Sequence, residues 1–291
     1  MTSRKAFAAL VGGLGVVAGI IGSTAVAAAV LVALGLPSEG RADDSPAPVT
    51  QPRPTELVVA LGLSDPVLQA GVVRDGEVIL ARGLEVEIAR NLARRLGIPR
   101  VRFVYVTPVS RLLAATSRPW HIAISSVRST RAAAATADLS ESYLGTDQAV
   151  VLRRGLLRLT TLDELSSKVT CAVRGSDGDR AIFASVRPVT RPILTVTSGR
   201  LLELVQTGVC DAALVDADGV GRLVAGRGGF LGPITARVEF GSGFVVAVTR
   251  GGPIAVAEVE RALNRMRADG TLHRLNRSWL GIDPARLVPL R

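Results

Sequence analysis

The sequence is poor in the residue types that build metal sites and nucleophilic catalytic sites. Its 291 residues include only two histidines and two cysteines, and Cys171 and Cys210 do not have a metal-ligand spacing. Aromatic residues make up 3% of the chain, so base-stacking platforms for single-stranded nucleic acid are not expected. No Ser-His-Asp set and no paired general acid and base stand out either. We therefore expect a protein that binds its ligand without a metal or cofactor and without catalysis.

The charge is shifted toward the basic side. Lys and Arg number 35 against 25 Asp and Glu, and the isoelectric point is about 11.1. Such a balance is found in nucleic-acid-binding proteins, but here the arginines are scattered and no basic tract is interleaved with aromatic residues. The composition suits a protein near an anionic envelope, or one with an acidic ligand, and we expect no nucleic-acid partner.

The amino-terminal segment predicts export from the cytoplasm. Residues 6–36 carry no charge and follow Arg4 and Lys5. This run exceeds both the roughly 7–15 residues of a signal-peptide core and the roughly 20 residues that span a bilayer. It is predicted to be an uncleaved signal anchor or, alternatively, a long cleaved signal peptide, and both place the remainder outside the cytoplasm. Residues 37–55 form a proline-rich linker.

Strand patterns alternate with helix patterns through the first half of the folded part. Residues 57–61 have the composition of a buried strand. In residues 101–105, Val101, Phe103 and Tyr105 alternate with Arg102 and Val104, which predicts a second strand. Between them, residues 84–96 repeat leucine or isoleucine every four positions, and Gly97 ends this helix. A further strand is expected at residues 122–124. This alternation predicts an α/β fold with a parallel sheet.

The alternation restarts after Tyr143. Strands are expected at residues 148–152, 169–173, 193–196, 210–215 and 244–248, and an amphipathic helix at residues 254–266. Two consecutive α/β units, each with polar residues at strand carboxyl ends, predict two lobes that face a cleft. Cys171 and Cys210 fall on strands expected to be neighbours, which is compatible with a disulfide or with two buried thiols.

A segment rich in hydrogen-bond donors follows the strand at residues 122–124. Residues 125–131 read Ser-Ser-Val-Arg-Ser-Thr-Arg, and these hydroxyl and guanidinium groups suit a carboxylate ligand. Open α/β sheets bind their ligands at the carboxyl ends of strands. We therefore interpret this segment as part of a binding site, with a solvated turn before an alanine-rich helix as the alternative.

Four motifs, in order, resemble the extracellular solute-binding proteins of family 3, which serve amino-acid importers of the ABC class. Residues 83–89 are similar to that family's GFEVDLA, residues 138–143 to DFSDPY, residues 210–216 to VDAVVVD, and residues 267–272 to KADGTL. The resemblance runs from about residue 57 to residue 281. It implies the two-lobed periplasmic-binding-protein fold of type II, here preceded by a hydrophobic amino-terminal helix, and an ABC permease or a membrane sensor as partner.

The resemblance also implies a division of the chain. The first lobe would comprise residues 56–146 and 250–291, and the second lobe residues 147–249. Two hinge segments are expected near residues 145–148 and 241–243. The two lobes of the family close on an amino acid that binds between them.

Carried over position by position, the family's ligand contacts give a set of expected binding residues. They are Ser64, Asp65, Arg111, Ser125, Ser126, Thr130, Ser176, Asp177 and Asp216. Asp216 matches the carboxylate that pairs with the ligand's α-ammonium, and Ser125 and Ser126 match donors to its α-carboxylate. Arg111 resembles an arginine of members that take acidic amino acids, so an acidic amino acid is one expected solute.

The chain departs from the family at one position that matters for binding. The arginine that clamps the ligand's carboxylate falls on Ala133, and a bidentate arginine is hard to replace. Arg128 or Arg131 could bind the same anion from another direction, and we expect the solute carboxylate to lie between Arg111 and Arg128. The alanine at this position motivates one alternative, a degenerate, ligand-poor member that acts as a sensor or interaction module. A second alternative, a dehydratase-type enzyme, rests on the fold alone, which also carries dehydratases.

Overall fold

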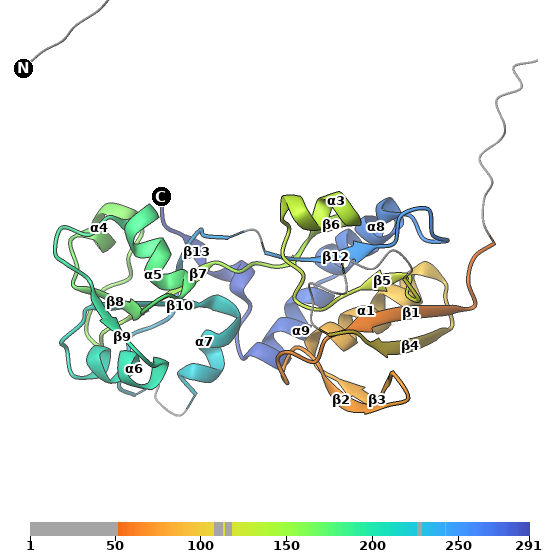
Figure 1. Ribbon diagram of the computed structural model, residues 1–291. Helices are drawn as coiled ribbons and strands as arrows, with labels where there is room; N and C mark the ends of the chain where they lie inside the picture. The colour runs from red at the N-terminus through yellow and green to blue at the C-terminus, as the bar shows by residue number, and fades with distance from the viewer. Residues whose placement is uncertain (1–51, 108–112, 114–117, 226–228, 242) are drawn as a thin grey trace, which may run out of the picture. The chain divides into compact units, whose positions relative to one another are not determined.

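The computed structural model describes residues 52–107, 113, 118–225, 229–241 and 243–291 (Figure 1). The hydrophobic segment at residues 6–36, nearly all of the linker and Arg111 lie outside these residues. Among the helices that are described, none has both the length and the apolar character of a membrane span.

The first sheet has seven strands in the order β2-β3-β4-β1-β5-β12-β6. Its strands are β1 (Glu56–Leu61), β2 (Ala70–Arg74), β3 (Glu77–Arg82), β4 (Arg100–Tyr105), β5 (Ile122–Ala123), β6 (Asp138–Leu144) and β12 (Phe244–Val248). Strand β1 pairs in parallel with β4 and β5, as predicted. The sheet as a whole is mixed rather than parallel, because the β2–β3 hairpin and the returning strand β12 add antiparallel pairs.

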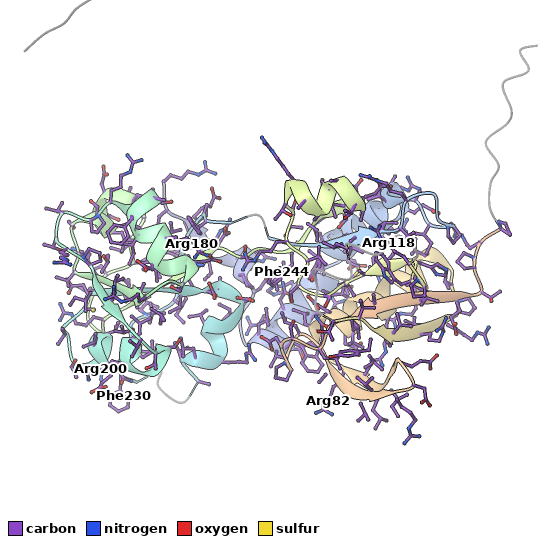
Figure 2. All side chains as sticks on the ribbon, viewed as in Figure 1. Arg82, Arg118, Arg180, Arg200, Phe230 and Phe244 are labelled. Atoms are coloured by element: carbon purple, nitrogen blue, oxygen red, sulfur yellow. The ribbon has the colours of Figure 1, made fainter. Side chains whose placement is uncertain are left out.

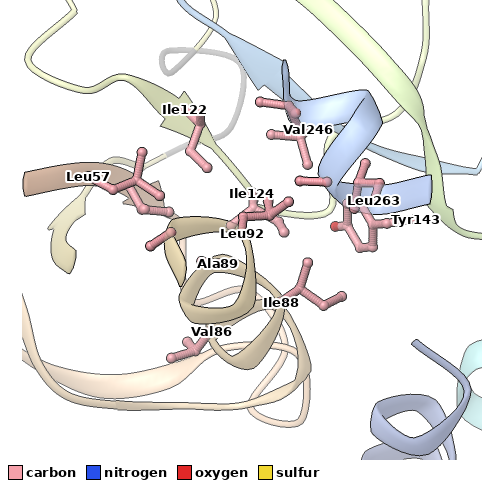
Figure 3. Packing of buried hydrophobic residues seen from close by; sticks show 14 of the residues in the cluster. Leu57, Val86, Ile88, Ala89, Leu92, Ile122, Ile124, Tyr143, Val246 and Leu263 are labelled. Carbon is pink, nitrogen blue, oxygen red and sulfur yellow. The ribbon is translucent and has the colours of Figure 1, made fainter. Parts of the chain in front are cut away.

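Helices α1 (Leu84–Leu96), α8 (Val256–Ala268) and α9 (Thr271–Leu280) bury one face of the first sheet, and α3 (Arg131–Thr136) follows β5. The predicted four-residue spacing places Ile88 and Leu92 of α1 in this core. Figure 3 shows them packed with Ile122 and with Leu263 of α8. Apolar side chains around Trp120 form a second core cluster with the alternate residues of the same strands, so both faces of the sheet are buried.

The second sheet has six strands in the order β13-β11-β7-β10-β8-β9. Its strands are β7 (Gln148–Leu152), β8 (Thr170–Val173), β9 (Ile193–Thr195), β10 (Ala212–Asp216), β11 (Ala236–Val238) and β13 (Val288–Pro289). Its helices are α4 (Leu162–Ser166), α5 (Asp177–Ala181), α6 (Ser198–Gln206) and α7 (Ala217–Leu223), with a π-helical turn at Ile182–Val186. Separate core clusters lie on its two faces.

Cys171 and Cys210 belong to the core of this second lobe. Both are free thiols and both are buried. The sulfur of Cys171 lies 3.6 Å from the carbonyl oxygen of Ala212. A hydrogen bond with Cys210, together with burial, raises the pKa of Cys171. Of the two alternatives left open by the sequence, the structure has the thiols.

The chain passes between the sheets first from β6 to β7 and then from β11 to β12. At these passages the hydroxyl of Thr146 accepts the N–H of Gly243 at 3.2 Å. Gly241 has φ 99°, and a Cβ there would lie 2.7 Å from Thr146 Oγ1. Strand β12, which the expected boundary at residue 249 assigns to the second lobe, pairs with the first sheet. The sheets therefore change before residue 244, because β12 fills the position between β5 and β6.

A third passage was not anticipated from the sequence. After α9 and the 3-10 turn Pro284–Arg286, β13 pairs in parallel with β11 of the second sheet. Asp283 holds the start of this passage, since its carboxylate accepts Asn276 Nδ2 at 2.9 Å and lies 2.8 Å from His273 Nδ1. The end of the expected first-lobe segment at residues 250–291 thus contributes a strand to the second sheet.

Helix α7 can approach the end of α9 closely because residue 221 is glycine. A Cβ at Gly221 would overlap the carbonyl oxygen of Leu280, whereas a Cβ at Gly219 in the same helix would meet no atom within 4 Å. We predict that Gly221→Ala lowers the free energy of unfolding by about 1–3 kcal/mol through overpacking. Gly219→Ala is the matched control and should raise it by up to about 1 kcal/mol, because alanine favours helix. Chemical denaturation of both variants tests this, and equal effects would contradict it.

Candidate functional site

A buried carboxylate, Glu85, organises the carboxyl edge of the first sheet. It lies at the start of α1 and accepts hydrogen bonds from the Tyr143 hydroxyl, from Gln69 Nε2 and, at 2.8 Å, from the Ser126 N–H. Burial raises the pKa of Glu85, while these hydrogen bonds act in the opposite direction. Burial and the neighbouring Glu85 raise the pKa of Tyr143 well above its ordinary value, so the phenol stays protonated as a donor.

Ser125 and Ser126, both expected to contact the ligand, belong to this network. Ser125 is fully buried, and its hydroxyl oxygen accepts the Gly62 N–H at 2.8 Å. Ser126 adopts a left-handed backbone with φ 49°, unusual for a residue with a side chain. Its N–H and hydroxyl both face Glu85. The two serines thus fix the shape of the loop that carries Arg128.

Arg128 extends from this loop to the second lobe. Its guanidinium donates to Asp177 Oδ2 at 3.2 Å and to Thr146 Oγ1 at 3.3 Å. Its Cζ lies 5.4 Å from the ring centre of Phe244, which is labelled in Figure 2. The side chain of Arg128 is 44% exposed, so one side of the guanidinium remains accessible. Ala133, at the position of the family's arginine, is buried in α3.

A cavity of about 260 Å³ lies at the carboxyl edge of the second sheet and is lined by Gln148, Ser176 and Asp216, among other residues. Asp216 ends β10 but caps no N–H of α7. Its carboxylate accepts Gln148 Nε2 at 2.8 Å. Gln148 is fully buried, and its Oε1 has no hydrogen-bond partner among the described residues. The cavity therefore presents the Asp216 carboxylate, held in place by Gln148, and this carboxylate suits a cationic donor.

Further carboxylates surround this cavity region. Asp218 is half-buried, and burial, with Asp216 and Asp65 nearby, raises its pKa to about 6. Asp65 lies 3.6 Å from Arg222 of α7 and accepts the Val67 N–H at 2.8 Å. Asp177 also accepts Arg180. The carboxylates of this region thus outnumber the arginine side chains that pair with them.

The structure brings some of the expected binding residues together and gives others a local role. Arg128 meets Asp177, and Asp65 influences Asp218 electrostatically. Thr130 caps α3 by accepting the Ala133 N–H at 3.1 Å, and Ser176 caps α5 through the Asp179 N–H at 3.1 Å. Ser64 is exposed at the end of the loop after β1.

Sequence reasoning missed Glu85, Gln148 and Asp218. Glu85 lies three positions before Ile88, which places a carboxylate on the apolar stripe of α1, and this spacing was a usable signal. Gln148 opens an otherwise apolar strand and pairs in register with Asp216. Asp218 stands two residues after Asp216, but its burial could not be seen from spacing.

Residues 73–282 match the family model of bacterial extracellular solute-binding proteins, family 3. The chain belongs to this family. A curated relative, the L-arginine-binding protein of Pseudomonas aeruginosa, is 26% identical over 153 residues, which is 50% of this chain and 59% of the relative. The match thus spans about three-fifths of that protein's length.

Solved structures show the same fold. The L-cystine solute receptor of Neisseria gonorrhoeae, in its unliganded open conformation, superposes with a TM-score of 0.62 at 21% identity, covering 78% of this chain and 94% of the receptor. The second substrate-binding domain of GlnP from Lactococcus lactis has a TM-score of 0.63 at 14% identity, covering 80% and 99%. These likenesses confirm the type II periplasmic-binding-protein fold expected from the sequence motifs.

The raised pKa of Asp218 makes the stability of the protein depend on pH. The carboxyl has a pKa of about 6 in the folded state against an ordinary value of 3.8, so the folded protein holds this proton more tightly than the unfolded chain. Its contribution to the free energy of unfolding therefore falls as pH rises from about 4 to about 6 and stays low above.

We predict that Asp218→Asn raises the free energy of unfolding at pH 7 by about 1–2 kcal/mol, and changes it little near pH 4. Urea denaturation between pH 4 and pH 8 measures this difference. Asp163→Asn, at an exposed position of α4, is the control for removal of a carboxylate charge. A gain for Asp218→Asn that is equal at both pH values would contradict the assignment.

Proposed function

We propose that this protein captures an amino acid outside the cytoplasm and presents it to an ABC-type permease or a membrane sensor. The observation that carries the proposal is the separation of opposite charges between the lobes. Arg128 extends from the first-lobe loop, whereas Asp216 and Gln148 line a cavity of the second lobe. An amino-acid zwitterion has a carboxylate for Arg128 and an ammonium for Asp216. It gains both contacts only when it touches both lobes.

The α-carboxylate would bind Arg128. The guanidinium now donates to Asp177 and Thr146 at distances of 3.2 and 3.3 Å, at the long end for a charge-assisted hydrogen bond. A ligand carboxylate can replace Asp177 as its partner while the Phe244 ring keeps supporting the guanidinium. Arg128 would then take over the role of the arginine that the family places at Ala133.

The α-ammonium would bind Asp216. Gln148 Nε2 already holds one oxygen of Asp216, and its buried Oε1 lacks a partner among the described residues. A buried acceptor without a donor costs folding free energy. An ammonium in the cavity would pair with the Asp216 carboxylate, whose position Gln148 fixes from behind.

The surrounding charges favour a neutral or cationic side chain on the solute. Asp65 and Asp218 add negative charge beside Asp216, and Arg222 pairs with Asp65. A curated relative is an L-arginine-binding protein, which agrees with this balance. The expectation of an acidic solute depended on Arg111, which lies outside the described residues, so we place acidic amino acids behind basic and neutral ones.

Binding alone is sufficient for this role, and we propose no catalysis. Affinity would come from charge-assisted hydrogen bonds shielded from water, and closure from contacts that the ligand gains in the shut state. Residues 1–36 would tether the protein to the membrane or direct its secretion. The rival reading, a ligand-poor interaction module, takes its support from Ala133, and it predicts that no amino acid binds.

A calorimetric screen of the full-length protein tests the proposal. We expect arginine, lysine or glutamine to bind with a dissociation constant below about 100 µM, and aspartate and glutamate to bind at least tenfold more weakly. At equal concentration, the ligands should also raise the melting temperature in the order of their affinities. Absence of binding by all twenty amino acids up to about 10 mM would favour the ligand-poor module.

Two variants test the contacts with the α-carboxylate and with the α-ammonium of the ligand separately. Arg128→Gln should weaken binding of the best ligand about tenfold or more, yet leave unchanged an analogue without the α-carboxylate. Gln148→Leu should weaken the intact ligand about tenfold and leave unchanged an analogue without the α-ammonium. Arg261→Gln, at an exposed position of α8, is the matched control. A loss of affinity that is the same for all analogues would mean that these side chains act through the fold.

A further inference from the structure

A second cavity lies away from the carboxyl edges of the sheets. Its volume is about 360 Å³, and it is bordered by α9, by the turn Pro284–Arg286 and by the segment before β11. Its lining includes three arginines, Arg158, Arg277 and Arg286. It shares no lining residue with the cavity of Asp216.

The guanidinium groups of the three arginines have no ion pair or hydrogen bond with any described residue. Other arginines of the chain do pair, as Arg237 does with Asp147 at 2.8 Å and Arg153 does with Asp211 at 3.1 Å. The three around this cavity are exposed and leave their donors available to a ligand. Three like charges around one cavity repel each other, and this repulsion is relieved when an anion enters.

The one carboxylate in the lining, Asp283, cannot serve all three guanidinium groups. It accepts Asn276 Nδ2 at 2.9 Å and the Ala285 N–H at 3.2 Å, and lies 2.8 Å from His273 Nδ1. In addition, Thr235 borders the cavity, and its Oγ1 is buried without a partner among the described residues. The lining therefore holds a surplus of donors.

We propose that this cavity binds a phosphate-type oxyanion through Arg158, Arg277 and Arg286. A single carboxylate is satisfied by one bidentate arginine, whereas a phosphate offers acceptors to several guanidinium groups at once. The volume also leaves room for an organic group attached to the phosphate, such as that of a phosphate ester.

The site would join parts of the chain that belong to different sheets. Arg277 lies on α9, whose Leu272 and Leu280 pack in the core of the first sheet. Arg158 lies in the segment that follows β7 of the second sheet. Phosphate binding is therefore expected to stabilise the third passage of the chain, where β13 reaches β11.

Titration of the full-length protein with inorganic phosphate tests the proposal, at constant ionic strength adjusted with sodium chloride. We expect a dissociation constant at or below about 1 mM, and about tenfold weaker binding for each of Arg158→Gln, Arg277→Gln and Arg286→Gln. Arg261→Gln is the matched control, because Arg261 is exposed on α8 and also has no partner among the described residues. It should change the affinity less than twofold.

Two further measurements complete the test. Melting temperatures without phosphate establish that the variants fold. Titration with glycerophosphoglycerol, the phosphodiester of a lipid headgroup, distinguishes the sources of the anion: tighter binding than inorganic phosphate indicates a membrane lipid, and weaker binding a soluble phosphate. The proposal is overturned by the absence of phosphate binding up to about 10 mM, or by an effect of Arg261→Gln equal to that of the other three.

Discussion

The first lobe depends on a carboxylate that is buried without a cationic partner in the part of the chain that the structure describes. Glu85 is held by donors from three separate segments, namely Gln69 after β1, Ser126 after β5 and Tyr143 on β6. Removal of these donors would leave the full desolvation cost of the carboxyl uncompensated. These hydrogen bonds therefore fix α1, the loops after β1 and β5, and β6 relative to one another. The loop after β5 carries Arg128, so Arg128 is held in place as well. A binding site benefits, because less conformational entropy is lost when the ligand orders its contacts.

In the second lobe, the pairing of two strands alone is enough to fix the proposed binding residues. Gln148 and Asp216 are opposite residues of the antiparallel strands β7 and β10, so the sheet register itself sets their contact. Gln148 also begins the strand that directly follows the first passage between the sheets. Thr146, two residues earlier, connects Arg128 with Gly243 of the other passage. The groups proposed to recognise the solute thus lie within a few residues of the segments that join the lobes, where a small rotation changes their separation.

The sequence predicted the parts of this structure that periodicity and short motifs encode. The strands corresponding to β1, β4, β7 and β12 and the helix α1 are present at nearly the predicted residues, because apolar runs and four-residue spacing reflect burial directly. The hairpin of β2 and β3 and the short strand β13 were missed, since their pairing depends on long-range contacts and their residues are partly exposed. In the proposed site, Asp216 and Arg128 could be predicted because they follow strand ends. The hydrogen bonds of Ser125 within the lobe could not be predicted, because its partners Gly62 and Gln69 lie about sixty positions earlier in the sequence.

The proposed replacement of the family's arginine at position 133 by Arg128 is physically consistent. Residue 133 is the third residue of α3, and its backbone N–H is capped by Thr130, so the helix keeps its start whichever side chain follows. An alanine there buries its methyl group against the lobe. Residue 128 precedes the helix and forms a β-bridge with Phe244, which places its side chain beside the segment that joins the lobes. A cation at this position contacts Asp177 of the other lobe before any solute arrives. The guanidinium of Arg128 can therefore stabilise the contact between the lobes without ligand and then bind a ligand carboxylate. An arginine at position 133, within α3, would lie farther from the segment that joins the lobes.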